Sequence, residues 1–147
     1  MKKLLPFLSA AILLTSCAVK KQIKEDQTLL NGNWELASAS FSKDLSKDFK
    51  EGLPTLNFDS TDNLAVFGYD GCNRINTKAT LKKDQGIVID QELRTTMMAC
   101  NKVKSNEYQN ALKAATTYDL KNNVLILKSE TSELKFYKVS LNGNLCG

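Results

Sequence analysis

Between residues 31 and 139 the chain is a series of short apolar segments separated by turn residues. In several segments apolar and polar residues alternate with a period of two, which is typical of a strand with one buried face. Asn, Asp, Gly and Ser fill the intervals and favour turns. The expected strands are residues 34–38, 56–58, 64–69, 77–81, 87–89, 92–95, 118–120, 124–127 and 134–139. This rhythm predicts an antiparallel domain of eight or nine strands.

One segment departs from the rhythm. Between Lys102 and Ala115, apolar side chains recur at spacings of three and four, which predicts an amphipathic helix. Asn101 and Ser105 are the candidate N-caps. The apolar stripe consists of Tyr108, Ala111, Leu112 and Ala115. We therefore expect a mainly β (α+β) fold, with a curved antiparallel sheet or partly open barrel of eight to nine strands and one packed helix.

The N-terminus has the features of an export signal. Met1–Lys3 is basic, Leu4–Leu14 is mostly apolar, and residues 14–17 read Leu-Thr-Ser-Cys. The apolar run is too short to span a bilayer. The last four residues resemble a bacterial lipobox, in which the signal is cut before a cysteine that carries a diacylglyceryl group. The resemblance predicts a lipoprotein signal peptide over residues 1–16 and lipidation of Cys17. The alternative is an ordinary secreted protein with a chance cysteine near the cut.

The chain that remains after this cut divides into three parts. Residues 17–30 are expected to be the lipidated cysteine and a polar tether, residues 31–141 the single domain, and residues 142–147 a short tail. Lysines in the tether either contact anionic headgroups or keep it solvated. Ala18 stands where enteric-type sorting reads an aspartate as a signal for the inner membrane. The prediction is a lipid-anchored envelope protein in the outer membrane, facing the periplasm.

The composition limits the chemistry of the domain. The formal net charge is only +4 at pH 7 and no basic stripe is interleaved with aromatics, so nucleic acid is not an expected partner. The chain has no histidine, which excludes Ser-His-Asp and Cys-His sites and leaves too few ligands for zinc. Asp59 with Asp62, and Asp84 with Asp90, flank turns as acids do on any solvated surface. We expect no enzymatic activity, no cofactor and no metal.

Two cysteine motifs mark the domain. Residues 71–74 read Gly-Cys-Asn-Arg directly after a strand, and residues 95–100 read Thr-Thr-Met-Met-Ala-Cys directly before the helix. Three further motifs are residues 32–36 (GNWEL), 54–58 (PTLNF) and 107–112 (EYQNAL). In this order, over about residues 31–139, they resemble the META domain, also called the HslJ family. Together the five motifs are far more specific than any one alone.

The cysteines have several expected fates. Export would place Cys72 and Cys100 in an oxidising compartment, where paired cysteines tend to form disulfides. That crosslink would stabilise the fold by roughly 3–4 kcal/mol. Two free thiols and a redox-active pair are the alternatives, although the chain has no Cys-x-x-Cys motif and no histidine to depress a thiol pKa. Cys146 is expected to be free, to pair with a second molecule, or to compete for another cysteine.

Four other side chains stand out. Arg74, one of only two arginines, either binds a carboxylate or phosphate ligand or pairs with a neighbouring carbonyl or acid to hold its loop. Met97 and Met98 either line a pliable apolar groove or pack in the core, and we expect core packing for at least one of them. Trp34 is expected to anchor the core or one end of the sheet.

Two functional hypotheses remain in front. The META resemblance implies an envelope protein of poorly defined activity, linked in bacteria to heat-shock induction and novobiocin resistance and in a parasite relative to virulence. The first hypothesis is a non-catalytic lipoprotein that supports envelope stress tolerance by binding an envelope partner. The alternative is a binder of a small apolar ligand or lipid, in a cavity between sheet and helix. An enzyme is the least favoured hypothesis.

Overall fold

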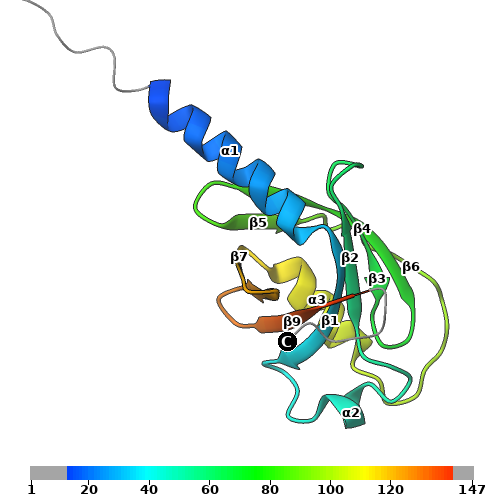
Figure 1. The fold of residues 1–147 in the computed structure, drawn as a ribbon. Helices are drawn as coiled ribbons and strands as arrows, with labels where there is room; N and C mark the ends of the chain where they lie inside the picture. The colour runs from blue at the N-terminus through cyan, green and yellow to red at the C-terminus, as the bar shows by residue number, and fades with distance from the viewer. Residues whose placement is uncertain (1–12, 141–147) are drawn as a thin grey trace, which may run out of the picture.

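The computed structural model describes residues 13–140, with side chains from Ser16 onward. These residues form three helices and nine strands (Figure 1). The helices are α1 (Leu13–Leu30), α2 (Leu45–Asp48) and α3 (Ser105–Ala114). The strands are β1 (Gly32–Ala39), β2 (Thr55–Asp59), β3 (Ala65–Tyr69), β4 (Arg74–Lys82), β5 (Gly86–Ile89), β6 (Arg94–Thr95), β7 (Thr117–Lys121), β8 (Val124–Lys128) and β9 (Glu133–Val139). All the expected strands and the expected helix are present, and α2 is an additional short element.

Eight of the strands close into an antiparallel barrel in the order β1, β2, β3, β4, β5, β7, β8, β9, with β9 returning to β1. The seam between β5 and β7 is the narrowest, with Gly86 and Thr117 as its aligned pair. β6 lies outside the ring and pairs with β4 alone among the described strands. The predicted fold class is confirmed, and the barrel is closed.

Side chains fill the interior of the barrel. In β4, exposed and buried residues alternate from end to end, so that one face points inward. Helix α3 turns its predicted apolar stripe toward this interior, where the ring of Tyr108 meets the rings of Phe49 and Phe136 edge-on, each at 6.5 Å between centroids. Full burial of one such apolar side chain contributes about 1.5–3 kcal/mol. Trp34 is buried in the same core, as expected.

Residues 17–30, the expected polar tether, are helical in the structure. This segment belongs to α1, which projects from the barrel beside the β4–β5 hairpin (Figure 1). Its last residue, Leu30, is fully buried, and the indole Nε1 of Trp34 donates a 2.7 Å hydrogen bond to the Leu30 carbonyl. Lys138 Nζ donates a 2.8 Å bond to the carbonyl of Leu29, where a cation also suits the helix dipole. The segment is therefore a helix docked at its C-terminal end.

Two local details also differ from expectation. Helix α3 has Lys104 as its N-cap, without a side-chain cap bond, so neither Asn101 nor Ser105 caps it. In α2, Asp44 is the N-cap and accepts a 3.1 Å bond from the Ser46 N–H. Among residues 13–140, no helix is both long and apolar enough to cross a membrane.

Candidate functional site

The two cysteine motifs meet in space. Cys72 follows β3, Cys100 precedes α3, and the structure joins them in the expected disulfide, with 5.8 Å between their Cα atoms. We call residues 70–74 and 95–100 together the motif junction. Because both thiols are consumed in this bond, the two free thiols considered as an alternative are not present here.

Asn73 fastens the second motif to the first. Its Oδ1 accepts a 2.6 Å bond from the Met98 N–H and a 3.0 Å bond from the Thr96 hydroxyl, and its Nδ2 donates to the Met98 carbonyl at 3.3 Å. The main chain of Arg74 continues this ladder, since its carbonyl accepts a 3.1 Å bond from the Thr96 N–H. The two cysteine motifs are thus held together by polar contacts as well as by the crosslink.

Asp70 organises the turn and was missed by sequence reasoning. Its carboxylate is buried; Oδ1 accepts bonds from the N–H groups of Cys72 (2.9 Å) and Asn73 (2.6 Å). Gly71 follows with φ +92, and a Cβ there would lie 2.3 Å from Cδ1 of Phe49. An Asp-Gly pair at the end of a predicted strand was the available signal, because Asp bonds its own following backbone in turns.

The guanidinium of Arg74 does not hold the loop. Among the described residues it forms no hydrogen bond or ion pair, and the junction is fixed by main-chain and Asn73 contacts instead. Arg74 lines an open depression of about 400 Å³ with Arg94 of β6, the only other arginine of the chain. Sequence reasoning placed Arg94 in an expected strand but did not single it out as a site residue, because only the pairing of β6 with β4 brings it close to Arg74.

The methionines of the second motif lie on the surface. Met97 is 97% exposed and Met98 is 65% exposed, so the expectation of core packing for at least one of them is wrong. The bonds from Asn73 fix the Met98 backbone along the outside of the barrel, where neither side chain reaches the core. Phe67 of β3 is also a large exposed apolar side chain, at 41%.

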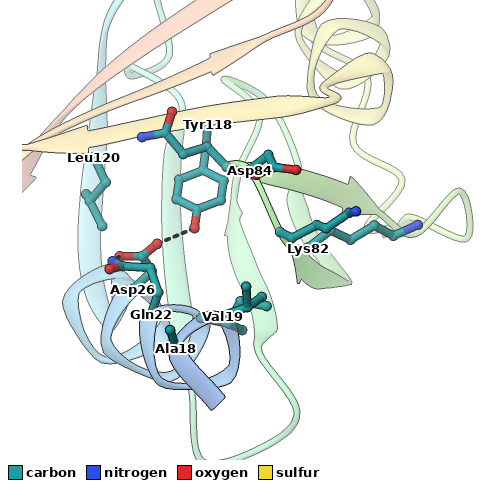
Figure 2. Close-up of a pocket in the computed structure, with 11 residues that line it drawn as sticks. Ala18, Val19, Gln22, Asp26, Lys82, Asp84, Tyr118 and Leu120 are labelled. Carbon is teal, nitrogen blue, oxygen red and sulfur yellow. Dashed lines mark hydrogen bonds between the residues drawn. The ribbon is translucent and has the colours of Figure 1, made fainter. Parts of the chain in front are cut away.

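A second cleft, of about 540 Å³, lies between α1 and the barrel (Figure 2). Five residues of α1 form one wall, and the end of β4 with the loop that follows it supplies the opposite wall. The α1 residues are Ala18, Val19, Gln22, Ile23 and Asp26, and the opposite wall consists of Lys82, Lys83, Asp84 and Gln85. The lining mixes apolar, acidic and basic groups. It therefore has no single chemical preference.

Asp26 and Tyr118 meet in this cleft. The Tyr118 hydroxyl donates a hydrogen bond to Oδ2 of Asp26, which joins α1 to β7 across 92 residues of sequence (Figure 2). Burial raises the pKa of Tyr118 well above its ordinary value, and the bond to the Asp26 carboxylate raises it further. The phenol therefore stays protonated at neutral pH and serves as a donor.

Two of the candidate carboxylates, those of Asp59 and Asp90, accept hydrogen bonds within turns. Asp59 Oδ1 accepts bonds from the Thr61 N–H (2.9 Å) and hydroxyl (2.6 Å), and these bonds lower the pKa of Asp59. Within residues 13–140 no three His, Cys, Asp or Glu side chains gather to hold a metal ion. Cys17 is free and exposed on α1, whereas Cys146 lies outside the described residues.

The space between sheet and α3 is the place where an apolar-ligand cavity was expected. Tyr108, Leu112 and Phe136 occupy it and are fully buried. Both clefts described above lie outside this core, one over β3, β4 and β6 and the other beside α1. Both of these clefts are therefore surface sites.

The arrangement defines a small antiparallel barrel plugged by one helix and closed over a disulfide-linked motif junction. A family model for the META domain matches residues 27–140, and the chain belongs to this family. No curated protein sequence matches the chain closely enough to serve as a relative.

Solved structures share the fold. A DUF4847 family protein from Bacteroides vulgatus ATCC 8482 has a TM-score of 0.58 and 18% identity, covering 79% of this chain and 99% of its own. A protein from Burkholderia xenovorans, solved by NMR, has a TM-score of 0.61 and 22% identity, covering 79% and 88%. At these identities the likeness supports the fold alone.

Proposed function

We propose that this protein is a non-catalytic lipoprotein of the cell envelope, anchored through Cys17, whose META domain binds an envelope partner and supports stress tolerance. The observation that carries the anchoring is the position of Cys17, exposed near the start of a helix whose other end is fixed to the barrel. From Cys17 to Leu30 that helix rises about 20 Å. It would hold the barrel at a set distance from the acylated end.

The charge of α1 also supports a membrane at the Cys17 end of the helix. Lys20, Lys21 and Lys24 are exposed within two turns of Cys17, and only Lys21 has an acidic partner near it, Glu25 at 3.9 Å. Each lysine near an anionic leaflet contributes about 1 kcal/mol. These residues would add electrostatic attraction to the hold of the acyl chains, in the outer membrane facing the periplasm.

Partner binding is favoured over small-ligand binding. Buried side chains occupy the space between the sheet and α3, while Phe67 of β3 and Met97 and Met98 of the second motif are exposed. Large exposed apolar side chains are candidate contacts for a partner protein. A non-catalytic role is consistent with carboxylates that serve turns and with a chain that has no histidine.

The anchor is tested by feeding cells an alkyne analogue of palmitate and detecting label on the full-length chain. We expect wild type and the cysteine control Cys146→Ser to carry label and to fractionate with the outer membrane. Cys17→Ser should carry none and should appear in the soluble periplasmic fraction. A Cys17→Ser chain that still carries label, or a wild-type chain without label, would overturn the anchoring proposal.

The partner is tested in the same cells. A photoreactive residue at an exposed surface position should crosslink to one dominant envelope protein, and scattered crosslinks that follow protein abundance would contradict partner binding. A deletion strain should lose viability under heat or novobiocin. Wild type should restore it, and Cys17→Ser, which keeps the domain but lacks the anchor, should not.

A further inference from the structure

The Arg74–Arg94 depression is an unpaired cationic site on the outside of the barrel. Phe67, Asn76 and Arg94 lie side by side across β3, β4 and β6, because Phe67 aligns with Asn76 and Asn76 aligns with Arg94. Arg74 lies two residues before Asn76 in β4, and its side chain is therefore on the same face of the strand. No acidic residue lines this depression.

Two guanidinium groups without ion-pair partners at one site favour the binding of an anion. Among the described residues neither Arg74 nor Arg94 forms an ion pair. Guanidinium groups bind carboxylates bidentately, and such charge-assisted bonds are about twice as strong as neutral ones. The depression therefore favours a ligand with at least two carboxylates or an equivalent anion.

The edge of β6 favours an extended peptide as the bearer of those carboxylates. The Thr96 N–H is bonded to the Arg74 carbonyl, so the alternation of an antiparallel ladder turns the N–H and C=O of Thr95 away from β4. No other strand among the described residues lies on that side of β6. An exposed edge of this kind takes up a partner's strand through main-chain bonds.

Apolar side chains lie close to the charged ones in this part of the surface. Phe67 lines the depression, and Met97, two residues after the end of β6, has 97% of its side chain exposed. Methionine is flexible and adapts to different partners. Beyond Arg94, the neighbouring depression is lined by three carboxylates (Asp62, Asp90 and Glu92) and one lysine (Lys78), so that acidic residues are less favoured there. The acidic part of the peptide is therefore confined to the side of Arg74.

We propose that the Arg74–Arg94 depression and the free edge of β6 bind an extended acidic segment of a partner protein. This inference deepens the proposed function and rests on it for the cellular setting, because it names the surface and the chemistry of the envelope partner. A strand that pairs with Thr95 would turn alternate, acidic side chains toward the face of the sheet that carries Arg74, Asn76 and Arg94.

The test uses the full chain purified from membranes in a mild detergent. The probe is a fluorescein-labelled peptide, Val-Glu-Val-Glu-Val-Glu-Val, read by fluorescence anisotropy at low salt, with the Gln-for-Glu peptide as its neutral control. The double variant Arg74→Gln with Arg94→Gln should weaken binding about tenfold. The matched double variant Lys78→Gln with Lys82→Gln removes the same charge from the same face of β4 and should change binding less than about twofold.

Each outcome decides the proposal. Preference for the acidic peptide, lost on removal of the arginines alone, supports it. Equal losses in both double variants would reduce the effect to net charge and overturn it. Inorganic phosphate or phosphatidylglycerol vesicles that bind through the arginines, while the peptide does not, would overturn it in favour of a phosphate or a lipid headgroup.

The failure of this site is distinguishable from the failure of the proposed function. Anisotropy of the purified chain does not depend on anchoring, which palmitate labelling measures separately. In cells, a photoreactive residue at Met97 should crosslink to the dominant partner and one at Val88, exposed on β5, should not. A dominant crosslink from Val88 and none from Met97 would keep partner binding and remove this surface.

Discussion

Gln109 Nε2 lies 2.5 Å from Oδ2 of Asp70, and this hydrogen bond ties helix α3 to the turn that carries Cys72. The other oxygen of Asp70 accepts the N–H groups of Cys72 and Asn73. Both oxygens of a fully buried carboxylate are therefore bonded, and the position of the motif junction against α3 depends on them.

Gln109 donates this hydrogen bond and Asp70 accepts it, so exchanging the donor and the acceptor between the two positions gives a prediction. Asp70→Asn turns an amide toward the amide of Gln109 and should lower the free energy of unfolding by roughly 1–3 kcal/mol. Gln109→Glu alone brings two carboxylates together and should also destabilise. The double variant Asp70→Asn with Gln109→Glu restores one donor and one acceptor. Urea unfolding should show that it recovers at least half of the summed loss, whereas additive losses would mean that the two side chains are not coupled.

The disulfide gives a second prediction. Cys72→Ser with Cys100→Ser should lower the free energy of unfolding by roughly 3–4 kcal/mol, because the crosslink closes a long loop in the unfolded chain. Cys17→Ser is the matched control and should leave stability unchanged. The midpoint of urea unfolding measures both, and a loss below about 1 kcal/mol would indicate that the polar contacts of Asn73 hold the junction without the crosslink.

Most strands were predictable because the alternation of buried and exposed residues is a local property of the sequence, and most strands of this barrel show it. In β4 the exposed and buried residues alternate without interruption, and the sequence pattern there is unambiguous. The helix α3 stripe was predictable for the same reason. Closure of the barrel was not, since it depends on a seam between β5 and β7 that aligns only Gly86 with Thr117.

The departures from expectation at α1 and at Met98 involve contacts between distant residues, whereas the N-cap of α3 departs locally. The local sequence of α1 does not indicate that Leu30 is buried. It also does not indicate that Asp26 accepts a hydrogen bond from Tyr118, 92 residues away. Met98 was expected inside because it is apolar, but a single side chain, Asn73, bonds its backbone on the outside. Such contacts override composition, and no periodic pattern encodes them.

The link between α2 and α3 makes a pH prediction. Asp48 accepts a 2.6 Å bond from the Ser42 hydroxyl and a 2.9 Å contact from Lys104 Nζ, and these bonds lower the pKa of Asp48 below its ordinary value of 3.8. A carboxyl with a lowered folded pKa stabilises the fold above its unfolded pKa, and this contribution is lost as the pH falls through the folded value.

Asp48→Asn should therefore melt at a lower temperature than wild type at pH 7. The gap between the two should close as the pH falls below about 4, because Asp48 itself then becomes neutral. Asp119→Asn, an exposed aspartate outside the ion pairs of the described residues, is the control and should run parallel to wild type. Thermal melts by circular dichroism measure the gap, and a constant gap from pH 7 to pH 3 would contradict the assignment.

The contact between Asp26 and Tyr118 decides how firmly α1 is docked. Tyr118→Phe removes the hydroxyl and leaves the carboxylate of Asp26 without this donor. We expect the amides of α1 to exchange about tenfold faster with deuterium, since a hydrogen bond to a charged group contributes roughly 1.5–3 kcal/mol. Amides of β8 should keep the wild-type rate, because the barrel core is untouched. Tyr137→Phe, which removes an exposed hydroxyl, is the matched control.

The same contact predicts how α1 responds to alkali. Because the folded pKa of Tyr118 lies above that of the unfolded chain, its contribution is fully present below about pH 10 and is lost as the pH rises through the folded value. In wild type, α1 should therefore keep its protection, relative to Tyr118→Phe, at every pH from 6 to about 9. Equal exchange of α1 in wild type and Tyr118→Phe at pH 7 would mean that Leu30 and the Lys138 bond alone dock the helix.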